Sequence, residues 1–213
     1  MKKGFLIAML ITVVGFILAG WFILTTEGEV PINWNMQGEV DRYGSPCWIL
    51  VFPAVSLFTT VLMYFIPKID PKGDNIKNSG PVLPVTMVLV SALMLGIQTF
   101  IIMATNGADI FNMTAFIFGA IGLLLIAIGY YTPKIKQNYM MGIRTPWTLA
   151  SEEVWTKTHK ASGKWLIASG VVFLASMFLN MTLALIISLT FVITVMLGLV
   201  VYSYVLYAQE KKG

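Results

Sequence analysis

The chain has 213 residues, of which 57% are hydrophobic and only 11% are charged, so its composition lies far outside that of soluble globular proteins. The charged residues are clustered and leave uncharged apolar stretches of about 20 residues, the length that crosses a bilayer core as a helix. We therefore predict a polytopic membrane protein. Its single Cys and single His exclude an internal disulfide and argue against a zinc site within one chain, and we predict neither a metal nor a cofactor.

Six spans are predicted, and together they form one membrane domain over residues 1–213. Pro53 is expected to kink the second span, and Pro84 is expected to lie in the first turn of the third, where proline is tolerated. The uncharged run 165–208 is twice as long as one span, so we divide it near residues 179–182 into a tight hairpin. The fold class is thus an all-α bundle of six transmembrane helices, with spans at about 4–24, 47–66, 81–105, 114–131, 165–179 and 183–208.

Charge distribution predicts the orientation of these spans. An even number of spans places both termini on one side of the membrane, and 13 of the 14 Lys and Arg residues fall in segments on that side, with only Arg42 opposite. By the positive-inside rule this side is the cytoplasm, which would carry a net charge of +8 against −4 outside. We interpret the basic charge as an orientation signal and a contact for anionic lipids, not as a nucleic-acid footprint. The predicted location is the plasma membrane, with an outer loop at 25–46 and a cytoplasmic loop at 132–164.

Polar side chains inside the predicted spans are few. None of the spans contains an Asp, Glu, Lys, Arg or His residue, which lowers the prior for a proton-coupled or sodium-coupled transporter. Gln98 is predicted to hydrogen-bond to a neighbouring helix; lining a small cavity is the less favoured interpretation. The spacings Gly15/Ala19 and Ala115/Gly119 indicate close helix packing within the chain rather than a dedicated dimer face.

The outer loop combines acidic, amide and aromatic side chains. Its alternating polar residues resemble the start of a calcium-binding loop, but the amides carry no charge and Gly44 stands where a bidentate Glu belongs, so calcium binding is not predicted. One interpretation is a structured turn with Trp34 and Tyr43 at the membrane interface, and the other is a recognition surface for something outside the cell. The candidate recognition residues are Asn33, Trp34, Asn35, Gly38, Glu39 and Asp41.

The inner segment, residues 138–160, is the other polar stretch of specific composition. Ser151 followed by two acidic residues predicts a helix start, and the pattern beyond it predicts an amphipathic helix along the cytoplasmic membrane surface, leading into the fifth span through Gly163. His159 is interpreted as a hydrogen-bonding residue rather than a catalyst. Arg144 would either pair with Glu152 or Glu153, which is favoured, or hold a phosphate.

Both polar stretches resemble the signatures of the SdpI family, the immunity proteins for sporulation-delaying peptide toxins. The first signature is Pro31-Ile32-Asn33-Trp34-Asn35 with Gly38-Glu39-Val40-Asp41, although Asn33 occupies a position where the family pattern has His. The second comprises Asn138, the run Gly142-Ile143-Arg144-Thr145-Pro146-Trp147-Thr148-Leu149, and Ser151-Glu152-Glu153-Val154-Trp155. The resemblance implies a bacterial membrane protein that protects its cell from a membrane-active peptide toxin. It also implies signalling, in which the toxin-engaged protein holds a transcriptional repressor at the membrane.

Our leading hypothesis is a non-enzymatic immunity protein whose outer loop contacts the toxin and whose inner segment stabilises the bundle or docks a partner. A small-solute transporter or lipid-handling protein, with Gln98 and Arg144 near a substrate path, is the alternative. A membrane enzyme ranks last, because it would have to use His159 with Glu152 or Glu153. The candidate residues of the inner segment are Asn138, Gly142, Arg144, Thr145, Pro146, Trp147, Trp155 and His159.

Overall fold

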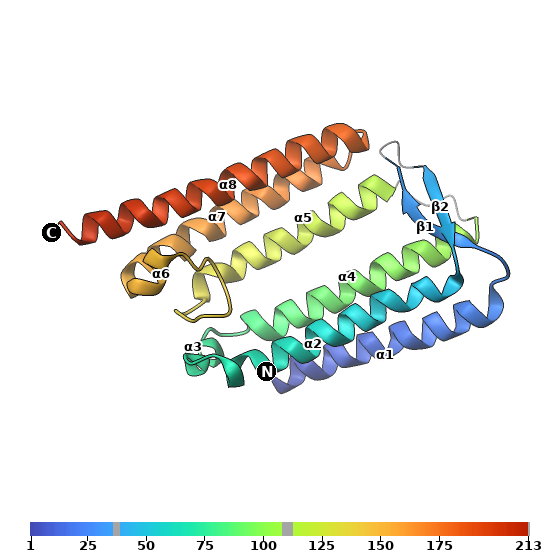
Figure 1. Cartoon of the computed structure of the whole chain (residues 1–213), viewed down its shortest axis with the longest axis horizontal. Coiled ribbons are helices and arrows are strands. Elements are labelled where there is room, and N and C mark those ends of the chain that lie inside the picture. The colour runs from blue at the N-terminus through green and yellow to red at the C-terminus, as the bar shows by residue number, and fades with distance from the viewer. Residues whose placement is uncertain (36–38, 108–112, 213) are drawn as a thin grey trace.

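The structure, a computed structural model, describes residues 1–35, 39–107 and 113–212, and it is helical apart from one two-stranded hairpin. Its long helices run side by side along the molecule (Figure 1). They are α1 (Lys2–Thr25), α2 (Val51–Ile69), α4 (Val82–Thr105), α5 (Met113–Tyr131), α7 (Glu152–Ser176) and α8 (Met181–Glu210). The short elements are β1 (Val30–Trp34), β2 (Val40–Gly44), η1 (Pro46–Leu50), α3 (Gly73–Lys77), η2 (Thr132–Lys134) and α6 (Pro146–Ala150).

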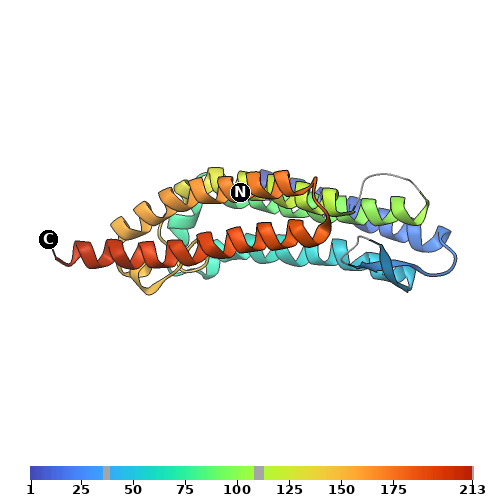
Figure 2. The same ribbon diagram turned by 90° about the horizontal axis from the view of Figure 1, so that it is seen from above.

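The two ends of the molecule carry different elements. The β1–β2 hairpin lies at one end, whereas α3, α6 and the start of α1 lie toward the other, where α8 also ends (Figure 1). Seen from above, α8 and α2 lie on one side of the molecule and α5 and α7 on the other (Figure 2). Both termini lie away from the hairpin (Figure 1).

Five helical segments among the described residues are long and apolar enough to cross a membrane, namely α1, η1 with α2, α4, α5 and α8. The predicted fifth span lies in α7, whose first half carries the charged residues of the expected amphipathic helix. These two predicted elements are one uninterrupted helix. Gly163 lies inside this helix. It allows close packing, because a Cβ there would lie 2.7 Å from Cγ of Pro133.

The long helices pack in two groups, α1 with α2 and α4, and α5 with α7 and α8, while α4 and α5 link them. The most extensive packing is between α5 and α7. A Cβ on Gly122 would lie 2.8 Å from the carbonyl oxygen of Gly170, and one on Gly129 would lie 2.8 Å from that of Gly163. Small residues let helix backbones approach in this way, which is how apolar helices associate in lipid. The sequence analysis had singled out other pairs, of which Gly15 and Ala19 are buried in α1.

Buried polar side chains join the first helix group. The prediction for Gln98 is confirmed, because its Nε2 donates to the carbonyl oxygen of Gly15 at 2.8 Å, and the whole side chain is buried. The Thr12 and Ser56 hydroxyls lie 2.6 Å apart, which ties α1 to α2. The Oε1 atom of Gln98 is buried without a hydrogen-bond partner among the described residues.

Helix ends differ in detail from the prediction. Pro84 lies in the first turn of α4, as predicted. The kink predicted at Pro53 is wrong: this proline lies in the first turn of α2, after the 3-10 turn η1, where a missing N–H costs little. The predicted hairpin between the last two helices is present, and Asn180 caps α8 by accepting from the Leu183 N–H at 3.0 Å.

Candidate functional site

The inner segment begins in a polar junction that we call the latch, formed by residues 70–79 and 135–141. The buried Asp70 carboxylate accepts the Lys72 N–H at 2.6 Å and the Tyr139 N–H at 2.8 Å. Asn75 donates through Nδ2 to the Gln137 carbonyl oxygen at 2.8 Å. Because residues 70–79 follow α2 and residues 135–141 follow α5 and η2, these bonds join the two helix groups at their α3 end.

The side-chain amides of Asn138 and Gln137 form hydrogen bonds within the latch and to α6. Asn138 is fully buried, and its Oδ1 accepts the N–H groups of Met140 at 2.9 Å and Met141 at 2.6 Å. Its Nδ2 donates to the Lys136 carbonyl oxygen at 2.8 Å. The Nε2 of Gln137 donates to the carbonyl oxygen of Thr148 at 2.9 Å, which ties the latch to α6. Every polar atom of the Asn138 side chain is therefore used to shape the turn, which leaves none for a ligand.

His159 is the centre of the inner segment. Its Nε2 accepts the Ile143 N–H at 3.0 Å, so that nitrogen carries no proton, and its Nδ1 lies 2.9 Å from the Trp155 carbonyl oxygen, to which it donates. The ring stacks on Trp155 with centroids 4.0 Å apart, and Trp155 Nε1 donates to the Ile135 carbonyl oxygen at 2.8 Å. Burial lowers the pKa of His159, while the hydrogen bond to the Trp155 carbonyl opposes this in part. His159 is thus a neutral, fully engaged side chain.

Gly142 lies directly over this imidazole, where no side chain larger than hydrogen fits. Its φ is +95°, in the left-handed region that L residues avoid. A Cβ there would lie 2.2 Å from Nε2 of His159. The glycine therefore supplies both the turn and the space through which Ile143 reaches the histidine.

Thr145, Pro146 and Trp147 join this segment to α8. Thr145 caps α6 in a capping box with Thr148, and its hydroxyl lies 3.0 Å from that of Ser203 in α8. Pro146 occupies the first turn of α6, where its missing N–H costs nothing. The Trp147 ring lies 5.1 Å from that of Tyr204, also in α8. These three residues dock α6 onto the last helix.

Arg144 is exposed and differs from the prediction. Its guanidinium donates to the Tyr139 carbonyl oxygen at 2.7 Å. Among the described residues it forms no ion pair, and Glu153 pairs instead with Lys157 at 2.6 Å. The favoured pairing of Arg144 with Glu152 or Glu153 is therefore absent among the described residues, and Glu153 is instead held by Lys157, one turn further along α7. One contact of Arg144 is to the latch, and the rest of its head group faces solvent.

The other candidate residues lie in the hairpin at the opposite end of the molecule (Figure 1). Trp34 packs against the core cluster around Phe22 and Ile49, which anchors β1 on the helices. Asn33 and Asp41 are exposed. The carbonyl oxygen of Glu39 accepts the Asn35 N–H at 2.8 Å, and the Glu39 N–H donates to Oδ1 of Asn35 at 2.9 Å. Gly38 lies outside the described residues.

The structure thus gathers the candidate residues into two clusters at opposite ends, the hairpin and the inner segment. Sequence reasoning missed the strands, and it missed Asp70 and Gln137, which the latch uses most. Asp70 had a signal: an Asp directly before Pro71 at the end of an apolar run is typical of a side chain that caps its own turn. Gln137 had none, because its partners lie far from it in the sequence.

Comparison with known proteins covers both clusters. Residues 134–205 match the SdpI/YfhL protein family, and residues 10–57 match a domain of unknown function, DUF1648. The chain is 26% identical over 213 residues to "Immunity protein SdpI" of Bacillus subtilis (strain 168), which covers 100% of this chain and 98% of that one. No solved structure matches. The region 10–57 holds the whole hairpin and the region 134–205 holds the inner segment, so the predicted family resemblance is confirmed.

Proposed function

Residues 134–205 carry the SdpI/YfhL family match, and on that premise we propose that this chain is a membrane immunity protein that protects its cell from a membrane-active peptide toxin. The observation that carries this proposal is the full-length similarity to an immunity protein. The match covers the full length of this chain. The protein acts by binding or blocking the toxin and does no chemistry on it.

The proposal includes the topology. All six long helices cross the plasma membrane, with α7 crossing through its apolar second half, and the hairpin faces outward. The α3 end then faces the cytoplasm with both termini, in agreement with the positive-inside rule. In this orientation the hairpin is the element that an external toxin meets first.

We assign different tasks to the two clusters. Asn33 and Asp41 lie on a hairpin that Trp34 anchors to the helices, and they form an exposed contact surface. The inner segment fixes the packing of the second helix group and, through the latch, its position against the first. Arg144 is an exposed cation of this segment that lies in the family signature, and it is the residue that we expect to meet a cytoplasmic repressor.

The two competing functions, an enzyme and a transporter, have less support. An enzyme would need His159 as a base, but both of its ring nitrogens are held by main-chain groups. A transporter would need Gln98 and Arg144 on one path. Gln98 instead bonds to α1 from inside α4, whereas Arg144 directly precedes α6, which lies toward the end of the molecule away from the hairpin (Figure 1).

The test is survival of a toxin-sensitive bacterium that expresses this protein under challenge with a sporulation-delaying-type peptide. Native protein should protect. Asn33→Ala should weaken protection if the hairpin contacts the toxin, and Arg144→Ala should abolish protection or signalling while the protein still inserts. Loss in only one of the two variants would show which side of the membrane matters.

Matched controls make this result interpretable. Lys211→Ala removes a different exposed cation, outside the inner segment, and should leave protection unchanged. Abundance and insertion of each variant are measured in the same cells. If native protein inserts normally and gives no protection, the immunity proposal is overturned, and solute flux or lipid handling becomes the function to test in reconstituted vesicles.

A further inference from the structure

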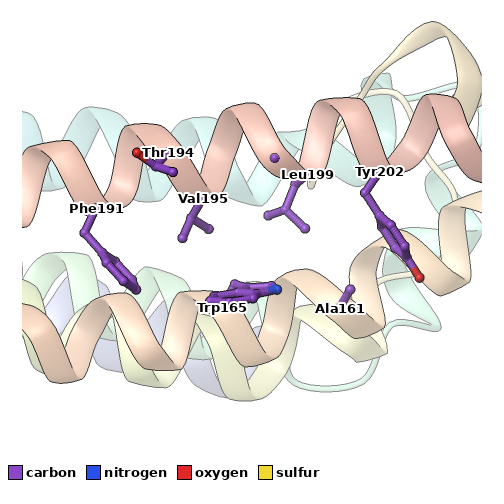
Figure 3. Close-up of a pocket in the computed structure, with 8 residues that line it drawn as sticks. Ala161, Trp165, Phe191, Thr194, Val195, Leu199 and Tyr202 are labelled. Atoms are coloured by element: carbon purple, nitrogen blue, oxygen red, sulfur yellow. The ribbon is translucent and has the colours of Figure 1, made fainter.

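A groove of about 570 Å³ runs between α7 and α8 on the outside of the second helix group. Phe191, Val195 and Leu199 point into it from α8, while Trp165 lies along α7 beneath them (Figure 3). Its walls are almost entirely apolar. A groove of this kind, on helices that stand in a bilayer, is open to lipid rather than to water.

The groove has the length of one leaflet. Phe191 and Tyr202 mark its ends on α8, and eleven helical steps between them span roughly 16 Å. Half of a hydrocarbon core about 30 Å thick is roughly 15 Å. Since α8 runs toward the cytoplasm in the proposed topology, Tyr202 lies at the cytoplasmic end of the groove and Phe191 near the bilayer centre.

Toward the Phe191 end the polar lining side chain is Thr194, whose hydroxyl already donates to the Thr190 carbonyl oxygen at 2.8 Å, so the polar groups left for a ligand lie at the Tyr202 end. The Tyr202 hydroxyl points toward α7 near Ala161, and the indole nitrogen of Trp165 lies on the side of its ring toward Ala161 (Figure 3). Aromatic residues with a polar tip favour the headgroup level of a membrane. The groove is therefore amphipathic along its length, apolar at the membrane centre and with hydrogen-bonding groups where an ester and headgroup would lie.

Two lysines edge this end. Lys160 and Lys164 are exposed, one turn apart, and immediately precede the lining residues Ala161 and Trp165. Among the described residues neither is in an ion pair, whereas Lys157 is paired with Glu153. Side chains on a helix lean toward its N-terminus, which for α7 is the cytoplasmic end. Both ammonium groups are thus placed to reach a phosphate at the mouth of the groove.

We propose that this groove is a binding site for an anionic phospholipid of the cytoplasmic leaflet. One acyl chain lies along Phe191, Val195 and Trp165, and the phosphate meets Lys160 and Lys164. The inference rests on the proposed topology, because only that orientation puts the lysines at the cytoplasmic headgroups. It requires no toxin, so it can fail without the immunity function failing.

The test uses purified full-length protein in detergent micelles, titrated with brominated phosphatidylglycerol or brominated phosphatidylcholine. Bromine quenches tryptophan fluorescence on contact, and subtracting the signal of Trp165→Phe isolates this one indole. We expect quenching of Trp165 at a lower mole fraction of phosphatidylglycerol than of phosphatidylcholine. Lys160→Gln and Lys164→Gln should each weaken the preference roughly fivefold.

A groove-filling variant gives the second arm. A Cβ on Gly198 would meet nothing within 4 Å, so Gly198→Leu fills the groove without displacing the fold, and the selective quenching should disappear. Gly20→Leu is the matched control, because Gly20 of α1 has equally open space outside the groove. The same preference should persist in that variant.

Three results would overturn the proposal. Equal quenching by the two lipids would show an ordinary lipid annulus. Selective quenching that survives Gly198→Leu would place the anionic lipid elsewhere. A second copy of the chain would be the occupant if Thr194→Cys, in a Cys47→Ala background, forms disulfide-linked dimers that added phosphatidylglycerol does not diminish.

Discussion

At the scale of single residues, the inner segment is a set of side chains that satisfy main-chain groups. Asn138, His159 and Trp155 each bond to backbone atoms and are buried, and Gly142 leaves the space that one of those bonds requires. Buried polar groups with every partner in place specify one arrangement of a loop, because any alternative strands a donor or acceptor. Arg144 differs from these buried residues because its charged side chain is exposed.

Gly142→Ala should lower thermal stability. The new Cβ would meet Nε2 of His159 at 2.2 Å in a backbone region that L residues avoid, so we expect a loss of about 2–4 kcal/mol. The measurement is thermal unfolding in detergent. Gly80→Ala is the control, since Gly80 also has positive φ but a Cβ there meets nothing within 4 Å. Equal losses in both variants would assign the effect to backbone strain and remove the histidine contact from the explanation.

Acid should weaken the inner segment through His159. Its pKa is lowered by burial, so the folded state holds the neutral form, and the stabilisation is complete above the ordinary value of 6.5 and lost as pH falls below it. Thermal stability should therefore decrease from pH 7.5 to 5.5 in native protein. His159→Gln should be less stable at pH 7.5 and flatter across this range. A slope unchanged by the substitution would mean that another group titrates.

At the scale of elements, the short loops between helices do more than connect them. The latch joins the segment after α2 to the segment after α5, and α6 docks on α8 through Thr145 and Trp147. In lipid, apolar helix surfaces give little preference for one neighbour over another, so polar contacts at the helix ends carry much of the specificity. The loops thus decide which helix groups meet.

Asp70→Asn should loosen the latch. An amide keeps one acceptor oxygen, so one of the two N–H groups now bound by the carboxylate loses its partner, at a cost of about 1.5–3 kcal/mol. The readout is thermal unfolding together with protease cleavage within residues 70–79. Asp74→Asn, at an exposed acid of α3 nearby, serves as the control and should change neither. A latch that resists protease as well as the native one would refute this role for Asp70.

At the scale of the whole molecule, orientation links the structure to the proposed function. The hairpin and the inner segment lie at opposite ends (Figure 1), so one must face the toxin and the other the cytoplasm if the helices cross a membrane. The distribution of Lys and Arg residues predicts which end faces the cytoplasm, because basic residues are retained on the cytoplasmic side.

Cysteine labelling in intact cells tests this assignment. In a Cys47→Ala background, Glu39→Cys should react with a membrane-impermeant thiol reagent, and Lys157→Cys should react only after the cells are permeabilised. Both positions are exposed, so access to the reagent depends on the side of the membrane. The reverse pattern would invert the topology and, with it, the assignment of the toxin-facing surface.

The sequence by itself determined the class of the molecule, because uncharged stretches of bilayer length are a property that no folding step can alter. It also placed the residues of the inner segment together and predicted the hydrogen bond of Gln98 to a neighbouring helix. Only the tertiary structure decided the partners. Arg144 binds a carbonyl instead of an acid, Gly163 packs closely against Pro133, and Gln137 joins segments remote from it. Each of these depends on distances between groups far apart along the chain, and local pattern carries no information about such distances.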